Sequence, residues 1–177
     1  MKGIIIFQPV IYTDERGFFF ESYNKQLFHT NGISTEFVQD NQSYSIYGVI
    51  RGLHYQKEPY AQSKLVRVLE GSILDVVLDI RAKSPWFGKT YSILLSAENK
   101  KQIFVPKGFA HGFSVLSETA VISYKCDQFY NGQSEAGIRF NDPGLNIDWQ
   151  IPSDKVLISE KDHLLPEFNP SMTDFIF

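Results

Sequence analysis

Little in this 177-residue sequence supports a disulfide-stabilised, membrane-spanning or nucleic-acid-binding protein. Its one cysteine, Cys126, cannot form a disulfide within the chain, so the fold does not require an oxidising compartment. The apolar run Ile4–Phe7 near the N-terminus is too short for a membrane span or for the core of a signal peptide. The net charge of −3 provides no broad positive field for nucleic acid or an anionic membrane surface. We therefore expect a cytoplasmic protein.

Glycine, proline and biased segments are also scarce. With 12 Gly and 8 Pro against an aromatic content of 15%, the composition excludes collagen-like and disordered chains. No internal repeat, linker-like tract or block of like charge divides the sequence. The length suits one domain with a substantial core, so residues 1–177 are expected to form a single domain.

Apolar residues with a period of two dominate the middle of the chain. In Leu74–Arg81 the apolar Leu74, Val76, Leu78 and Ile80 alternate with a more polar set, so one row of side chains is expected inside and the other largely outside. Shorter strands are predicted at 91–95, 102–105, 113–116 and 120–124, with turns between them. This pattern indicates an all-β sandwich or barrel of the jelly-roll kind.

Helix is expected only at the margins of this fold. The stretch Ser22–His29 can form a short helix, with Ser22 as a possible N-cap and with Leu27 and Phe28 on its buried side. One further turn is expected from about Ser159 onward.

Charged and polar residues interrupt two of the apolar segments. Arg51, His54, Gln56 and Lys64 lie in strand-like sequence, where buried polar groups need partners or a ligand to offset their desolvation. A cavity lined by polar groups would provide such partners and room for a ligand. Further along, Pro106 and Gly108 are expected to fix a turn before His111 enters a strand.

These positions resemble the two motifs of the cupin barrels. The first motif corresponds to Gly48, His54, Gln56, Lys64 and Gly71. The second, Pro-x-Gly-x-x-His, corresponds to Pro106, Gly108 and His111. In that pattern Gln56 stands where a second histidine would be, and Lys64 stands where an acidic ligand would be. Metal sites favour neutral imidazoles and carboxylates over a cationic neighbour, so we expect a cupin barrel without a metal.

A more specific resemblance covers nearly the whole chain and is to the dTDP-4-dehydrorhamnose 3,5-epimerase family. It is carried by segments in the family's order, namely Asp14–Glu21, Phe37–Asn41, Arg51–Gln56, Asp79–Arg81 with Ser84 and Pro85, Leu95–Asn99, Pro106–Phe113, Tyr124 and Lys125, Asn141 and Asp142, and Ser159–Asp162. The resemblance implies an all-β cupin-type jelly roll with short peripheral helices. It also implies inversion of C3 and C5 in a 4-keto-6-deoxyglucose carried on dTDP, within dTDP-rhamnose biosynthesis.

Such an inversion needs a base, an acid on the opposite face and a positive group at the carbonyl oxygen, and it needs no cofactor. By this resemblance His54 is the base, Asp162 is the carboxylate behind it and Tyr124 is the proton donor. Lys64 is expected to stabilise the enolate oxygen, and His111 to line the same site. An imidazole suits the role of base because it titrates near neutral pH.

The resemblance also supplies a substrate-binding set and an oligomeric state. Tyr130 is expected to stack on the nucleobase, and the other binding residues are Arg16, Glu21, Gln39, Asn41, Arg51, Glu135 and Lys161. The expected partners are the dTDP-linked sugar and a second copy of the chain in a homodimer, across whose interface some of these residues would act. Strand Ile4–Phe7 could pair with the partner's sheet or with its own.

Other interpretations of the same residues remain open at this point. His54 or His111 could be satisfied inside the barrel, Lys64 could extend to solvent, and Tyr124 could be plain core. Asp162 could cap the tail helix, and Arg16 could be a solvated charge in a hairpin turn. Cys126 is expected to be a small strand residue, and His29 and His163 to be surface residues. Alternative functions are a C3-only or C5-only epimerase or a ketoisomerase, a silent sugar-nucleotide binding module, and a metal-dependent oxygenase, with which Gln56 and Lys64 conflict.

Overall fold

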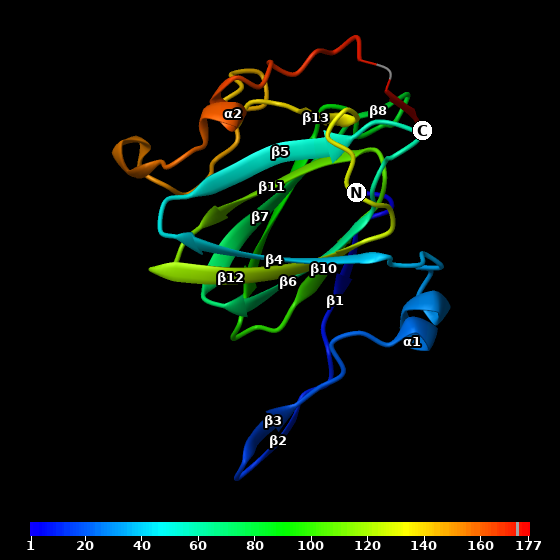
Figure 1. Cartoon of the computed structure of the whole chain (residues 1–177), viewed down its shortest axis with the longest axis vertical. Coiled ribbons are helices and arrows are strands. Elements are labelled where there is room, and N and C mark those ends of the chain that lie inside the picture. The colour runs from blue at the N-terminus through cyan, green and yellow to red at the C-terminus, as the bar shows by residue number, and fades with distance from the viewer. Residues whose placement is uncertain (173) are drawn as a thin grey trace.

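Two five-stranded antiparallel sheets face each other in the computed structural model, which describes residues 1–172 and 174–177 (Figure 1). One sheet has the strand order β1-β10-β6-β12-β4, and the other has the order β13-β5-β11-β7-β9. The first sheet comprises β1 (Ile5–Phe7), β10 (Gln102–Val105), β6 (Lys64–Glu70), β12 (Thr119–Cys126) and β4 (Gln39–Ile46). The second comprises β13 (Glu135–Gly137), β5 (Ile50–Gln56), β11 (Phe109–Val115), β7 (Ser72–Asp79) and β9 (Thr90–Ser96). The predicted all-β jelly roll is confirmed.

The predicted strands are all present, and most are longer than their apolar runs. β9 and β12 extend the predicted segments 91–95 and 120–124, and β10 matches 102–105. β11 begins at Phe109, four residues before the predicted start, so His111 lies within the strand. There it pairs with β7 on one side and with β5 on the other, where its register partner is His54.

The burial predicted for β7 is wrong, because every residue of the strand after Ser72 is buried on whichever face it lies. Leu74, Val76 and Leu78 pack outside the sandwich against C-terminal segments that include Trp149 and Phe175. The row expected to be exposed instead faces the space between the sheets, where Val77 packs with residues of both sheets. The C-terminal third of the chain covers the outer face of this sheet, so the apolar alternation does not separate inside from solvent.

Both predicted helices exist as short turns. Helix α1 (Lys25–Thr30) begins later than expected, because the side chain of Asn24, and not of Ser22, accepts the hydrogen bond from the Leu27 amide (3.1 Å). Phe28 is buried as predicted, but Leu27 is exposed. Helix α2 (Glu160–His163) begins after Ser159, whose hydroxyl caps it by accepting from the amide of Asp162. A 3-10 turn, η1 (Ser153–Lys155), precedes α2.

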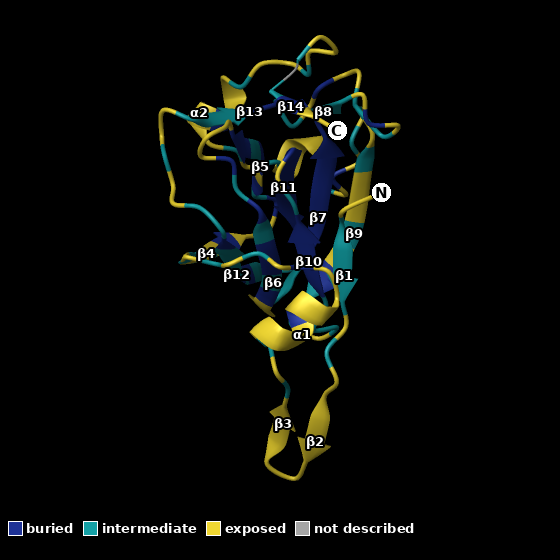
Figure 2. Ribbon diagram, turned by 90° about the vertical axis from the view of Figure 1, so that its right-hand side faces the viewer, coloured by how far each residue is buried: buried dark blue, intermediate teal, exposed yellow. Residues whose placement is uncertain are grey.

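A hairpin of two short strands, β2 (Tyr12–Asp14) and β3 (Gly17–Phe19), projects from the body of the sandwich (Figure 1). Figure 2 shows this hairpin as exposed, whereas β7 and β11 are buried. Its aromatic residues Tyr12, Phe18 and Phe19 are all exposed. Strand β1, which precedes the hairpin, pairs with β10 of its own chain.

The C-terminus forms a separate two-stranded sheet with the segment that follows β7. Strand β14 (Phe175–Ile176) pairs in parallel with β8 (Arg81–Ala82), directly after β7. Arg81 donates to the buried carboxylate of Asp79 and lies 4.9 Å from the centre of the Phe177 ring. Among the described residues, no helix has the length and apolar character needed to cross a membrane.

Candidate active site

A cavity of about 470 Å³ lies between the two sheets. Strands β5 and β11 of one sheet and strands β6 and β12 of the other supply facing walls, and residues of segment 157–162 line another side. Its polar and charged lining is Ser43, Arg51, His54, Lys64, His111, Tyr124, Ser159, Lys161 and Asp162. The remaining lining is largely apolar, so an organic ring could fill the space while polar groups address its substituents.

His54 and Asp162 form a hydrogen-bonded pair at one wall. The Nε2 atom of His54 lies 2.7 Å from Oδ1 of Asp162, and the amide of Gly52 donates to Oδ2 at 3.2 Å. Burial acts to raise the pKa of Asp162, but the hydrogen bond and charge of His54, helped by the Gly52 amide, hold that pKa below its usual value. The carboxylate therefore stays charged and holds the Nε2 proton, which leaves Nδ1 of His54 free to accept a proton.

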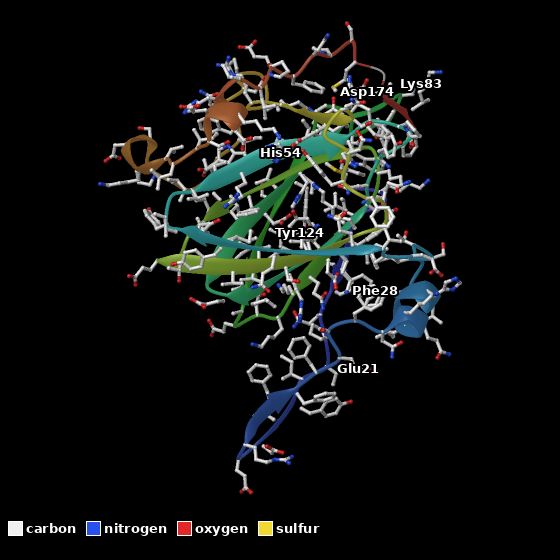
Figure 3. The ribbon with its side chains drawn as sticks, viewed as in Figure 1. Glu21, Phe28, His54, Lys83, Tyr124 and Asp174 are labelled. Carbon is white, nitrogen blue, oxygen red and sulfur yellow. The ribbon has the colours of Figure 1, made fainter. Side chains whose placement is uncertain are left out.

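Tyr124 and Lys64 come from the sheet that faces His54. Figure 3 shows His54 on β5 and Tyr124 on β12, on opposite sides of the space between the sheets. Burial raises the pKa of the Tyr124 phenol, so the hydroxyl remains protonated at neutral pH. Lys64 lies on the neighbouring strand β6, with its Nζ 6.0 Å from the centre of the Tyr124 ring. Desolvation lowers the pKa of this ammonium, although Cys126, Asp75 and Glu135 oppose the effect.

His111 forms a second imidazole–carboxylate pair. Its Nε2 atom lies 2.8 Å from Oδ2 of Asp75, which is fully buried on β7. The other oxygen of Asp75, Oδ1, is buried and has no hydrogen-bond partner among the described residues. The pair extends the polar wall next to His54, since His111 and His54 face each other in the β5–β11 register.

A smaller cavity of about 170 Å³ shares His54, Lys64 and Tyr124 with the first. Its other lining residues are Gln39, Asn41, Tyr55, Gln56, Gln62, Tyr130 and Glu135. The Tyr130 hydroxyl donates to Glu135 (2.6 Å), and Lys161 donates to the same oxygen (2.6 Å). Although burial acts to raise it, the pKa of Glu135 is lowered by these two bonds, so a charged carboxylate joins the two cavities.

The sequence matches a known family over most of its length. The family model described as dTDP-4-dehydrorhamnose 3,5-epimerase matches residues 1–170. The chain belongs to the dTDP-4-dehydrorhamnose 3,5-epimerase family. A curated relative of that name from Shigella flexneri is 52% identical and covers 92% of this chain and 89% of its own.

Solved structures of epimerases agree in fold as well as in sequence. The crystal structure of dTDP-4-dehydrorhamnose 3,5-epimerase from Elizabethkingia anophelis is 55% identical, with a TM-score of 0.90 over 94% of this chain and 92% of that one. The dTDP-6-deoxy-D-glucose-3,5-epimerase of Legionella pneumophila, crystallised with dTDP-4-keto-L-rhamnose, is 46% identical, with a TM-score of 0.88 over 96% and 95% of the two chains.

Two predicted site residues of this epimerase lie away from both cavities. Arg16 is in the turn of the β2–β3 hairpin, where it pairs with Asp14 and its side chain is 85% exposed. Glu21 follows the hairpin, and Figure 3 shows it at the neck, remote from His54 and Tyr124. Within one chain, then, the structure brings together all the predicted site residues except these two.

Two polar residues next to these cavities are not among the predicted site residues. Asp75 belongs to the row of β7 that the alternation predicts to be exposed, yet it is fully buried; a carboxylate among apolar strand residues is the signal for a buried partner. The cupin pattern identifies Gln56 only as a departure from metal binding. In the structure it is buried and its side chain hydrogen-bonds to three backbone groups.

Cys126 is a strand residue and His29 and His163 are surface residues, as predicted. Cys126 lies on β12, where its thiol is buried. Asp162 does not cap α2, since the cap is Ser159. Within residues 1–172 and 174–177, no three His, Cys, Asp or Glu side chains are grouped so as to hold a metal ion.

Proposed function

We propose that this chain converts dTDP-4-dehydro-6-deoxy-D-glucose to dTDP-4-dehydro-L-rhamnose by inverting C3 and C5. One observation carries the assignment of roles: the His54–Asp162 pair lies on one sheet, and Tyr124 lies on the facing sheet of the same cavity. Inversion requires removal of a proton from one face of a carbon and its return to the other. A base and an acid on opposite walls meet that requirement for a ring held between them.

The reaction begins with proton transfer from the substrate carbon to Nδ1 of His54. The electron pair of the broken C–H bond moves into the ring, and the negative charge develops on the C4 carbonyl oxygen. The ammonium of Lys64 stabilises this enolate, and Asp162 stabilises the imidazolium. Tyr124 then donates its proton to the opposite face of the carbon, and solvent restores the phenol and the neutral imidazole. Because C3 and C5 both adjoin C4, the same groups serve both centres.

The nucleotide end of the substrate is assigned to the smaller cavity. Tyr130 offers an exposed aromatic face for the base, and Gln39 and Asn41 offer amides beside it. Arg51 and Lys161, which line the larger cavity, supply cations for the diphosphate. In the free protein Arg51 donates to the hydroxyl of Ser45 and the carbonyl of Tyr44, contacts that it would exchange for phosphate oxygens.

We assign Arg16 and Glu21 to the site of a second copy in a homodimer. The hairpin that carries Arg16 exposes Tyr12, Phe18 and Phe19, an apolar surface that a partner would cover. A dimer would explain why two residues of the family's binding set lie outside the cavities of their own chain. The one cysteine, buried and free, fits the cytoplasm.

The deciding experiment incubates the protein with dTDP-4-keto-6-deoxyglucose in deuterated water containing a chelator and follows the ring positions by NMR. Deuterium entering both C5 and C3 supports the double epimerase. Entry at one position alone would assign the chain to a C3-only or C5-only epimerase. Absence of exchange at both, with dTDP still bound, would indicate a binding module and refute the enzymatic role.

A further inference from the structure

Gln56 is buried on β5 two residues after His54, so both side chains lie on the same face of the strand. The intervening Tyr55 points to the other face, where it packs against Phe175. His54 and Gln56 both line the smaller cavity. The strand that holds the proposed base therefore also places Gln56 at the proposed nucleotide site.

The side-chain amide of Gln56 is bonded entirely to backbone. Its Nε2 donates to the carbonyls of Tyr60 (2.6 Å) and Phe129 (3.3 Å), and its Oε1 accepts from the amide of Asn131 (2.7 Å). A glutamine offers two N–H donors and one carbonyl, so both donors and the acceptor are used. Neutral histidine has one donor and one acceptor, and glutamate has no donor when ionised, so neither could make this set of bonds.

Two of these bonds fall on either side of Tyr130. The carbonyl of the preceding residue and the amide of the following residue are both held by Gln56, and the amide of Tyr130 itself donates to Oε1 of Gln39 (3.1 Å). At the far end of the ring, the hydroxyl donates to Glu135. The backbone is thus fixed at three successive residues, while Tyr130 as a whole remains 59% exposed. This arrangement holds an aromatic face in place without covering it.

We propose that Gln56 is a positioning residue for the nucleoside: it fixes the loop that carries Tyr130 and so presents the ring to the base of the substrate. The inference rests on the proposed function, because it assigns Gln56 to the nucleotide end of that site. It also gives a role to the amide at the position where the cupin pattern has a second histidine. Gln56 acts through Tyr130 and does not take part in the proton transfers.

The test uses two substitutions in the full-length protein. Gln56→Met keeps most of the volume and removes every hydrogen bond, and Gln56→Glu keeps the shape and loses both donors. We expect the Kd for dTDP and the KM for the sugar nucleotide to rise roughly tenfold, the scale of a lost hydrogen bond to a buried group. The kcat at saturating substrate should stay within about twofold of wild type, because the bound substrate and the transition state lose the same nucleoside contact. Thermal unfolding shows which variants are folded.

A matched control is Asn99, whose side chain also makes three hydrogen bonds to backbone, with Ser96, Lys101 and Leu94, but in the turn between β9 and β10. Asn99→Ala should lower the unfolding temperature and leave both Kd and KM unchanged. A purely structural role for Gln56 would make the two positions behave alike, and that result would overturn the proposal.

A double-mutant cycle with Tyr130→Ala tests whether Gln56 acts through the ring. In the Tyr130→Ala background, a change at Gln56 should not weaken dTDP binding further. Full additivity would overturn the proposal, as would wild-type dTDP affinity in either folded Gln56 variant. If the wild-type protein catalyses exchange while the Gln56 variants bind dTDP normally, this inference alone fails. If the wild-type protein neither binds dTDP nor catalyses exchange, the proposed function fails first.

Discussion

Replacing Asp162 by Asn should slow turnover severely while the number of heavy atoms in the site stays the same. The reason is the second hydrogen bond of the carboxylate, which accepts from the buried amide of Gly52 as well as from His54. An asparagine must turn its oxygen toward Gly52, since its NH₂ would there meet another donor. Its NH₂ then faces Nε2 of His54 and forces the imidazole proton onto Nδ1, the nitrogen that should accept the substrate's proton.

The expected loss in kcat is on the order of 10³ to 10⁴, the range for an imidazole held in the wrong tautomer without its carboxylate. This corresponds to about 4 to 5.5 kcal/mol of transition-state stabilisation. The assay is the initial rate of deuterium entry at C5, followed by NMR, with dTDP affinity measured by calorimetry. That affinity should not change, because Asp162 lines the cavity that we assign to the sugar.

Asp142 provides the matched control for this substitution. It is another buried aspartate, whose oxygens accept from the amides of Gly144, Leu145 and Phe168. Asp142→Asn should lower the free energy of unfolding but leave the kcat of the folded enzyme unchanged. If Asp162→Asn retains exchange within about tenfold of wild type, the assignment of His54 and Asp162 as base and orienting carboxylate is refuted.

Four further predictions concern single side chains. His54→Asn should keep dTDP binding and abolish exchange, and retained exchange would show that the base is misassigned. Tyr124→Phe should lower the rate of inversion on the order of 10²-fold or more while deuterium still enters the substrate, since proton removal does not need the phenol. If the NMR assay shows that inversion and deuterium entry are slowed equally, Tyr124 is not the proton donor. Desolvation lowers the pKa of the Lys64 ammonium from its usual 10.5 and raises the pKa of the Tyr124 phenol from 10.0, and both shifts favour earlier loss of the Lys64 proton. We therefore expect the alkaline fall of kcat to move to higher pH in Lys64→Gln; an unmoved limb in the pH profile would contradict this. Burial acts to raise the pKa of Asp79, but hydrogen bonds from Arg81 and Ser84 hold that pKa below 3.8, so the stabilising effect of the carboxylate is present above the usual aspartate pKa and is lost as pH falls through the folded value. Asp79→Ala should therefore lower the free energy of unfolding in urea by roughly 3 to 5 kcal/mol at neutral pH and by less in acid. A difference that does not depend on pH would refute the pairing.

The strands could be predicted because their signal is local. Period-two alternation and turn residues depend only on neighbouring positions, and they located β7, β9, β10 and β12 to within a few residues. What covers each face of a strand is not local. The outward-facing row of β7 is buried by residues some 70 to 100 positions later, among them Trp149 and Phe175, so alternation alone cannot show that neither side is exposed.

Helix α1 shows a similar limit at shorter range. Ser22 and Asn24 are both good N-cap residues, and only the geometry shows that Asn24 binds the Leu27 amide. Tertiary contacts then decide which face is buried. Phe28 stacks on Phe7 with their ring centres 4.1 Å apart, and Leu27 is left exposed on the other side.

The partners of the cavity residues explain why a motif could locate the site but not fully describe it. The alternation of side chains along each strand places His54, Gln56 and Lys64 in the lining of the smaller cavity. Metal ligands at the same cupin positions would lie on that face for the same reason. What differs is the group that each side chain binds: the histidine is held by Asp162, the amide by backbone carbonyls, and the third position carries a cation. Those partners come from α2 and from loops outside the motif. Chemistry at these positions can therefore change from metal binding to proton transfer while the strands and their register stay the same.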